Sequence, residues 1–451
     1  MKSILYWELP SSVDVEGFLK KYPPAFKYKI DHFYYIVDYI SRGMDIENID
    51  DNAGFVNTNA QRLQKVIHNY KKYLEHLMKH RFIRTDMNYA PGKKSKGYLL
   101  NKYSGLQPSL KKIPITDFVM YKHKRREINE QKAVIAETKR QYPHLTKWFD
   151  GLQIKREKAL KEVKVILPIK TSGIRGVAKR KASNWAKRYR AVQAINKIAN
   201  GQFYYNIDDN VGRFHSNITN LKKELRKFIT YNGQQLVDVD IKNSQPLLSS
   251  LLLNTDFYSH NSLCNITTIP GYQFLLSNTY HSYTTTTIML VKTLKKSGNQ
   301  DINTYIECVN SGSFYDKIFN MLYPDESFEK DKVKTMIFMI LYSKNTYMGQ
   351  PKAEPKKRFK KMFPQTYKVF RILKLCDHTA LSRILQRIES DIMIQRVVPR
   401  IAHERPHLPI FTIHDSVVTT LGNKGYVALV IKEEIKKYTG LDAKIGIEYW
   451  Q

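Results

Sequence analysis

Three acidic residues in the C-terminal half of the chain have the spacing expected of metal ligands. In "LVDVDIKNSQPLL" (236–248), apolar residues favour a strand, whose alternation would place Asp238 and Asp240 on one side. In "TIHDSVVTT" (412–420), β-branched residues flank a tight turn that contains Asp415. Alone, Asp415 is either a turn former or a ligand. Two strands that deliver carboxylates to one point make a site for divalent cations, which take oxygen ligands and leave positions for phosphate.

A third segment has the spacing of a helix with a functional face. In "KDKVKTMIFMILYSK" (330–344), two cations and then two aromatics recur every four residues and share one face, with apolar residues opposite. Cations suit a triphosphate, and aromatics suit a base. The four residues are Lys330, Lys334, Phe338 and Tyr342.

Composition favours a polyanionic partner. The 451 residues include 74 Lys and Arg against 41 Asp and Glu, a formal charge of +33, so binding to nucleic acid would be salt-dependent. No apolar stretch approaches about 18 residues, and no signal peptide opens the chain, so we expect an intracellular, cytoplasmic protein that does not bind membranes. Three distant cysteines indicate neither a zinc ribbon nor a disulfide framework.

Residues 1–105 are predicted to form a winged-helix DNA-binding domain. A helical stretch (57–80) precedes "RFIRTD", a turn-rich basic segment and "YLLN", the order of helix, strand, wing and strand. Lys93, Lys94 and Lys96 would lie on the wing. The alternative is an ordinary helical cap with a hairpin.

The rest of the chain divides into a basic helical region and a motif-bearing region. Residues 106–205 are helical and rich in Lys and Arg, and Trp185 and Tyr189 interleave with the cations, which fits tracking of a nucleic-acid backbone. Residues 206–451 contain shorter elements, punctuated by Gly and Pro, and carry the acidic motifs.

Five motifs then occur in a recognisable order. They are GR(x)6NL from residue 212, VDxxxxQ, KxxxKxxxFxxxY, QxxxxD from residue 386 and a hydrophobic-HD pair. This order resembles the polymerase domain of family A DNA polymerases, and also the related single-subunit phage and mitochondrial RNA polymerases. The match runs from about 212 to the end, roughly half of the chain.

The resemblance implies an α+β right-hand fold: a palm with an antiparallel sheet, helical fingers and a thumb drawn from 106–205. It implies a DNA-directed DNA polymerase, a nucleotidyltransferase that extends a primer 3′-OH with two Mg²⁺ ions, or Mn²⁺. Its partners would be a DNA primer-template and nucleoside triphosphates, and it would act as a monomer. A proofreading exonuclease is not expected, because "DIE" at 45–47 matches that motif by letters only.

The resemblance also assigns catalytic and metal-binding roles. Asp240 and Asp415 match the two metal-binding aspartates, and the backbone carbonyl of Ile241 would complete the metal site. Lys330 and Lys334 would contact the triphosphate, and Lys334 would be catalytic.

The remaining roles concern the sugar, the base pair and the primer-template. Phe338 would lie near the sugar, Tyr342 would close over the nascent pair, and Gln245 occupies the position that faces the ribose. The residues implied to contact primer or template are Arg213, Asn220, Gln386 and His414.

Departures from the family leave the sugar preference open. At the position of Gln245, DNA polymerases of this family carry a Glu and the RNA polymerases carry a Gly. At the position of Ser416, many of the DNA polymerases carry a Glu, whereas the RNA polymerases resemble this chain. A single-subunit RNA polymerase or primase is therefore an alternative. A non-catalytic replication initiator is a second, and a nuclease a third. A compact, basic chain without an exonuclease would suit a phage, plasmid or other mobile element.

Overall fold

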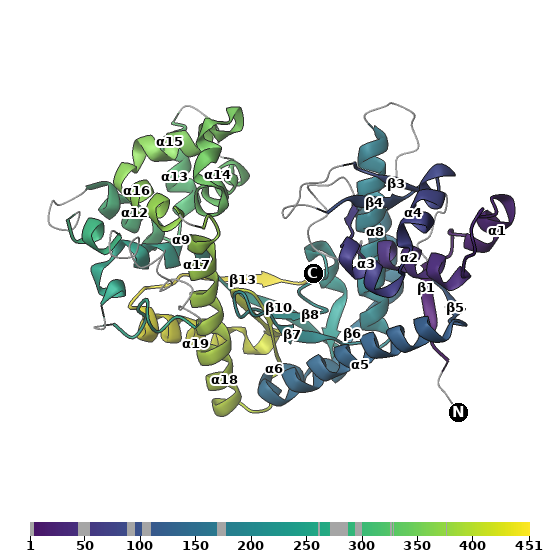
Figure 1. Ribbon diagram of the computed structural model, residues 1–451. Helices are drawn as coiled ribbons and strands as arrows, with labels where there is room; N and C mark the ends of the chain where they lie inside the picture. The colour runs from purple at the N-terminus through teal and green to yellow at the C-terminus, as the bar shows by residue number, and fades with distance from the viewer. Residues whose placement is uncertain are drawn as a thin grey trace. The chain divides into compact units, whose positions relative to one another are not determined.

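A computed structural model shows two compact units (Figure 1). The first consists of Met1–Glu137, Ile154–Phe203 and Asn220–Phe228, and the second of Thr138–Gln153, Tyr204–Thr219 and Ile229–Gln451. The structure describes residues 4–43, 55–87, 95–101, 110–168, 177–259, 262–270, 287–293, 300–324, 327, 329–375 and 377–451.

The N-terminal part of the first unit is a small helical layer on a three-stranded antiparallel sheet. Its sheet has the order β2-β4-β3. The elements of this part are β1 (Tyr6–Pro10), α1 (Val15–Lys21), α2 (Ile30–Gly43), β2 (Val56–Asn57), α3 (Ala60–Val66), α4 (Tyr70–Lys79), β3 (Ile83–Thr85), β4 (Gly97–Leu100) and β5 (Leu110–Pro114). The predicted helical stretch at 57–80 forms two helices, α3 and α4, which are followed by the two strands β3 and β4.

Aromatic side chains form the core of this part. On α4, Tyr70, Tyr73, Leu74 and Leu77 are buried at the spacing of one helical face. The helix α3 begins at Asn59, whose side chain accepts a hydrogen bond from a backbone N–H in the first turn. Of the expected wing lysines, Lys93 and Lys94 lie outside the described residues, as does the "DIE" segment, and Lys96 is exposed.

Three longer helices follow the N-terminal part. They are α5 (Phe118–Gln141), α7 (Arg156–Ile166) and α8 (Val177–Ala199), and α7 packs on α8. Tyr189 is buried in the aromatic core rather than exposed beside cations, while the side chain of Trp185 lies outside the described part of the chain. The predicted aromatic contribution of Tyr189 to nucleic-acid tracking is therefore wrong, because the ring packs inside the unit.

An antiparallel sheet forms the base of the second unit. The strand order is β11-β12-β10-β9-β6, and β13 also pairs with β10. The central strand β10 packs against α19, and its apolar residues are fully buried. The strands are β6 (Leu152–Ile154), β9 (Ile229–Tyr231), β10 (Gln234–Ile241), β11 (Ile410–Ile413), β12 (Ser416–Thr420) and β13 (Ile445–Tyr449), and a separate hairpin consists of β7 (Tyr205–Ile207) and β8 (Phe214–Ser216).

Helices make up the rest of the second unit, and the class is the expected mixture of helices and antiparallel sheet. The ring of Tyr305 on α12 lies 5.7 to 6.0 Å from four phenylalanine rings, which bind α12, α13, α15 and α16 into one core (Figure 1). The helices are α6 (Pro143–Thr146), α9 (Ser244–Ser249), α12 (Gln300–Asn310), α13 (Phe314–Leu322), α14 (Lys330–Tyr342), α15 (Glu354–Met362), α16 (Pro364–Leu373), α17 (Ala380–Ser390), α18 (Val398–Glu404) and α19 (Lys424–Thr439).

Two buried lysines hold the C-terminal end of α14. Lys356 donates to Ser343 Oγ at 2.9 Å and to the carbonyl of Lys344 at 3.1 Å, and Lys374 donates to the carbonyls of Ile340 and Ser343. The last carbonyls of a helix lack partners within it, so these amines satisfy them. Burial lowers the pKa of Lys356 to about 8 and, together with the neighbouring Lys356, that of Lys374 to about 7.

Candidate active site

A two-residue turn between β11 and β12 presents Asp415. Ile413 pairs with Ser416 across this hairpin, so His414 and Asp415 are the turn residues. His414 has φ of 55°, the left-handed conformation that one position of such a turn requires and that costs a non-glycine residue about 1 kcal/mol or more. The predicted tight hairpin is therefore present.

The pairing of β12 with β10 brings the second aspartate to the same place. Ser416 lies opposite Asp240, and the backbone N–H of Ile241 donates to the carbonyl of Asp415 at 3.3 Å. Asp240 and Asp415 are both partly exposed, whereas Asp238 is buried. The strand register therefore places the two predicted metal-binding aspartates side by side at one end of the sheet.

A glycine on the other neighbour of β10 makes room for the Asp240 carboxylate. Gly446 on β13 pairs with Asp240, and a Cβ at Gly446 would lie 3.0 Å from the Asp240 Cγ and 3.3 Å from its Oδ2, with Oδ1 closer still. Real Cβ atoms do not approach side chains this closely. The position of the carboxylate therefore depends on the missing side chain of Gly446.

Glu389 on α17 connects several predicted site residues. Its side chain is 1% exposed, and it accepts hydrogen bonds from Arg213 Nε at 3.1 Å and from Ser244 Oγ at 3.2 Å. The second Arg213 nitrogen and the amide of Gln245 donate to it as well. A buried carboxylate needs a countercharge and donors, and Glu389 has both.

The network continues from Gln245 to α14. The hydroxyl of Tyr342 donates to Gln245 Oε1 at 3.1 Å, so both ends of the Gln245 amide are engaged. Burial and the nearby charge of Glu389 raise the pKa of Tyr342 to about 12, while Gln386 hydrogen-bonds to the same hydroxyl. Tyr342 therefore stays protonated as a donor at neutral pH.

The outward face of α14 has the composition that the sequence predicts. Lys334 is exposed, its Nζ lies 5.9 Å from the centre of the Phe338 ring, and that ring lies 5.6 Å from the ring of Tyr342. Phe338 is 44% exposed, whereas Val333, Met336 and Ile340 on the opposite face are buried. An exposed aromatic beside a cation is available for a ligand. The side chain of Lys330 lies outside the described atoms.

The electrostatics of the site favour a bound cation. The pKa of Asp415 is raised well above its usual range, first by burial and then by the charges of Glu389, Asp240 and Asp238. Arg213 neutralises Glu389, but the other carboxylates repel one another. No group of three or more His, Cys, Asp or Glu among the described residues is arranged to hold a metal ion by itself.

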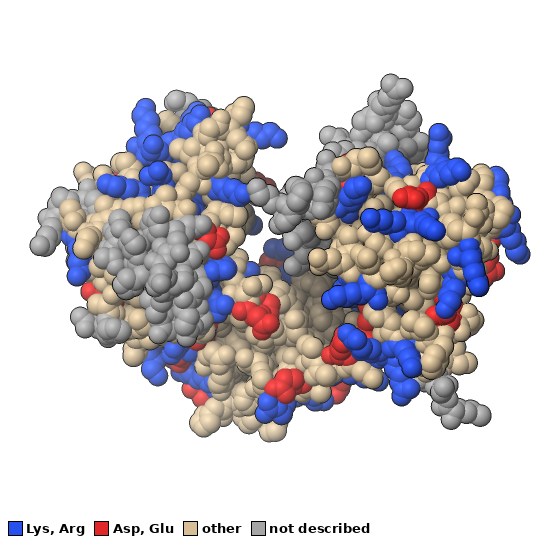
Figure 2. Space-filling model, viewed as in Figure 1, with Lys and Arg blue, Asp and Glu red and all other residues tan. Residues whose placement is uncertain are grey.

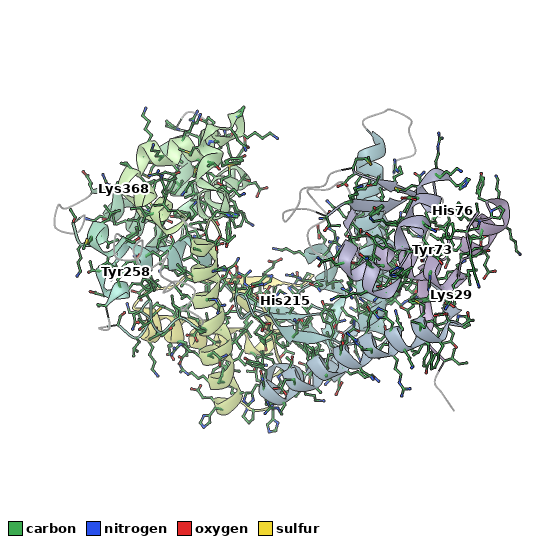
Figure 3. The ribbon with its side chains drawn as sticks, in the orientation of Figure 1. Lys29, Tyr73, His76, His215, Tyr258 and Lys368 are labelled. Carbon is green, nitrogen blue, oxygen red and sulfur yellow. The ribbon has the colours of Figure 1, made fainter. Side chains whose placement is uncertain are left out.

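The hairpin of β7 and β8 supplies Arg213 and a second histidine. Asp208 accepts from the backbone N–H groups of Asn210, Val211 and Arg213, at 2.8 to 3.0 Å, and thereby shapes the loop. His215, labelled in Figure 3 on the ribbon of β8, lies with its ring 6.4 Å from that of His414. The imidazole of His215 therefore lies near the turn that carries His414 and Asp415.

The structure brings most predicted residues of this region into contact. Asp240 and Asp415 share one end of the sheet, and Arg213, Gln245, Tyr342 and Gln386 meet around Glu389 and the tyrosine hydroxyl. Asn220 is exposed and belongs to the first unit.

Glu389 itself was missed by the sequence reasoning. A signal was present, since Glu389 falls on the face of α17 that also buries Leu385 and Ile388, and a charge on an apolar face needs a partner. Directly after the end of α17, residues Asp391–Val397 form a π-helical segment, an irregularity that is often found at functional sites.

Comparisons with known proteins give one distant likeness. No protein-family model matches the sequence, and no curated protein matches it. Among solved structures, the chain is similar to the polymerase domain of Pol1 from M. smegmatis in complex with DNA primer-template and dNTP, at 13% identity and a TM-score of 0.39. The match covers 64% of this chain and 56% of that one. A similarity this distant identifies neither a family nor a function. No helix among the described residues has the length and apolar character to cross a bilayer.

Proposed function

We propose that this chain is a DNA-directed DNA polymerase of the family A type, which extends a primer 3′-OH without a proofreading exonuclease. The observation that carries the proposal is the pairing of Asp240 with Ser416, which puts Asp240 and the turn residue Asp415 at the same end of an antiparallel sheet. The hydrogen bonds from Glu389 through Gln245 to Tyr342 connect this end to the helix with the cationic and aromatic face.

The donors present fit two Mg²⁺ ions, with Mn²⁺ as a substitute. Oxygen ligands suit these ions. Burial, and then the charges of Glu389, Asp240 and Asp238, raise the pKa of Asp415, and bound cations would relieve the repulsion among these carboxylates. Asp240, Asp415 and the backbone carbonyl of Ile241 would hold the ions and leave positions for phosphate oxygens. Bound there, the ions would lower the pKa of the primer hydroxyl and neutralise charge on the phosphates.

The residues of α14 would bind and orient the incoming nucleotide. Lys334, exposed near the N-terminal end, would stabilise the triphosphate, and Lys330 would support it. Phe338 and Tyr342 would contact the sugar and the nascent base pair. Gln245 would face the ribose, and because Glu389 and Tyr342 engage both ends of its amide, it would do so in one orientation.

Primer and template would be bound around the same site and by the basic regions of the chain. Arg213 and Asn220 are proposed to touch primer or template in the minor groove, and Gln386 is a further proposed contact. His414 would lie near the primer terminus. Residues 1–105 would act as a winged helix on duplex DNA and 106–205 as the thumb, with 206–451 as palm and fingers. Lys and Arg (blue) outnumber Asp and Glu on the described surface that Figure 2 shows, which favours a polyanionic partner. We place this activity in the cytoplasm, in a monomer encoded by a phage or mobile element.

Primer extension tests the proposal. The full chain receives a DNA primer-template, Mg²⁺ and either dNTPs or NTPs, and is compared with Asp415→Asn and with Asp442→Asn. Asp442 is an exposed partner of Lys436, so its variant makes the same chemical change in the same unit outside the site. Extension with dNTPs that is lost only in Asp415→Asn supports the proposal. No extension by wild type under any template contradicts it and favours the non-catalytic initiator.

A single-subunit RNA polymerase or primase is the second candidate. Gln245 in place of a Glu, and Ser416 after Asp415, favour it. Extension with NTPs alone in the same assay would select this function. Degradation of a labelled primer with Mg²⁺ and no nucleotide would instead select a nuclease.

A further inference from the structure

A second site lies in the first unit, where α7, α8 and the β1–β5 pair enclose a cavity of about 510 Å³. The volume is in the range of small-molecule sites. Among the described residues, two acidic ones line it, Glu8 and Glu157, and Glu157 is engaged by Arg156 at 2.6 Å. The cations that line it are Lys112, Arg156, Lys161, Lys164, Arg188 and Lys197.

Arg188 is the central feature of this cavity. Its side chain is 6% exposed, and its Nε has no hydrogen-bond partner among the residues that the structure describes. Burial lowers the pKa of the Arg188 guanidinium. A buried cation without a counterion is destabilising. The cavity wall therefore carries a buried positive charge whose Nε has no partner among the described residues.

Gln193, one and a half turns further along α8, has the same character. It is 6% exposed, lines the cavity and has an Nε2 without a partner among the described residues. Both orphaned atoms are hydrogen-bond donors, so the missing partner is an acceptor. A site that offers buried hydrogen-bond donors and is surrounded by lysines has the chemistry that recognises a phosphate.

We propose that this cavity binds a terminal phosphate group, whose oxygens would accept hydrogen bonds from the guanidinium of Arg188 and the side-chain amide of Gln193. Leu110, Leu160 and Val192 form an apolar part of the wall, against which an attached sugar or base would pack. The cavity has more room than a bare phosphate needs, which favours a phosphomonoester or polyphosphate of a nucleotide or of a nucleic-acid end. This site is separate from the aspartates of the second unit and does not depend on their function.

Thermal unfolding of the full chain gives the first test, with sodium pyrophosphate as the probe and NaCl added to equal ionic strength in the blank. Pyrophosphate should raise the melting temperature of wild type and of Arg126→Met, since Arg126 is an exposed arginine of the same unit outside the cavity. Arg188→Met should show no such rise. It should also melt higher than wild type without ligand, because it removes a buried positive charge. An equal pyrophosphate shift in wild type and Arg188→Met overturns the proposal.

Binding of short oligonucleotides separates the two sources of the phosphate. Fluorescence anisotropy compares a 5′-phosphorylated and a 5′-hydroxyl single-stranded oligonucleotide, with ADP as competitor. At least tenfold tighter binding of the phosphorylated strand, lost in Arg188→Met, assigns the site to a nucleic-acid end. A shift with ADP but no discrimination between strands assigns it to a free nucleotide. If neither of these two effects is observed, the proposal is refuted.

A pair of rim lysines keeps the test valid if Arg188→Met does not fold. Lys161 and Lys164 line the cavity and are exposed, so Lys161→Gln with Lys164→Gln should leave the unit folded. The affinity for whichever ligand binds wild type, the 5′-phosphorylated oligonucleotide or ADP, should fall about tenfold in this double variant, as expected for two charges lost beside a phosphate. Unchanged affinity in it would contradict the proposed site.

Discussion

Gly446→Ala should separate catalysis from stability at the proposed active site. The new methyl would lie 3.0 Å from Asp240 Cγ and nearer to Oδ1, so the carboxylate or strand β13 must shift by about 1 Å. A displacement of that size costs on the order of 100-fold in rate when a group must hold reacting atoms. Stability should change by less than about 1 kcal/mol, because Gly446 has an ordinary backbone conformation and Ala is at least as favourable as Gly in a strand.

The assay is single-nucleotide primer extension at saturating Mg²⁺, with urea denaturation of the same preparations. Gly425→Ala is the matched control, since a Cβ there would meet no atom within 4 Å, and it should retain wild-type activity. If Gly446→Ala extends primers at the wild-type rate, the observed position of Asp240 is not the catalytic one. If both glycine variants lose activity equally, the loss is not specific to Asp240.

Three further results are expected. Without metal, the raised pKa of Asp415 means that the folded chain holds an extra proton. The free energy of unfolding should therefore fall as the pH rises above the usual range of Asp pKa values. Asp415→Asn should abolish this fall, and its melting temperature should be several degrees higher than that of wild type at pH 7.5 in EDTA. The lowered pKa of Lys374, about 7, has the opposite sign, because the unfolded chain binds the extra proton between pH 7 and 9. This group should raise the free energy of unfolding by up to about 1.4 kcal/mol per pH unit, and Lys374→Met should remove its contribution to the slope in urea titrations and leave that of Lys356. Glu389→Gln should lower the free energy of unfolding by about 3 kcal/mol, because Arg213 loses its buried counterion, and a stability equal to wild type would show that the pair contributes nothing.

Local patterns determined much of the proposed site. Alternating apolar residues predict β10, and β-branched residues around an acid predict the hairpin, since both patterns follow from side chains that alternate across a strand. The fourfold spacing from Lys330 to Tyr342 likewise predicts α14 and its outward face. In each case the information lies within a dozen residues.

Contacts between segments that are far apart in the sequence could not be predicted from such local patterns. Glu389 joins Arg213, 176 residues earlier, and Gln245, 144 residues earlier, and no periodicity indicates which buried acid finds which arginine. Tyr189 was predicted to contact nucleic acid, but the tertiary fold buries it. The sequence could not show this, because a basic amphipathic helix has the same local pattern whether its aromatic residues face a core or a ligand.

The sequence by itself determined the strands, the tight turn and the helix that carry the candidate catalytic residues, because these depend on local spacing. Only the tertiary structure decided that Asp240 lies opposite Ser416 and against Gly446, and that Arg188 is buried with an Nε that has no partner among the described residues. The physical reason is that register and burial are set by packing between segments hundreds of residues apart, where desolvation turns a common side chain into a costly or a useful one.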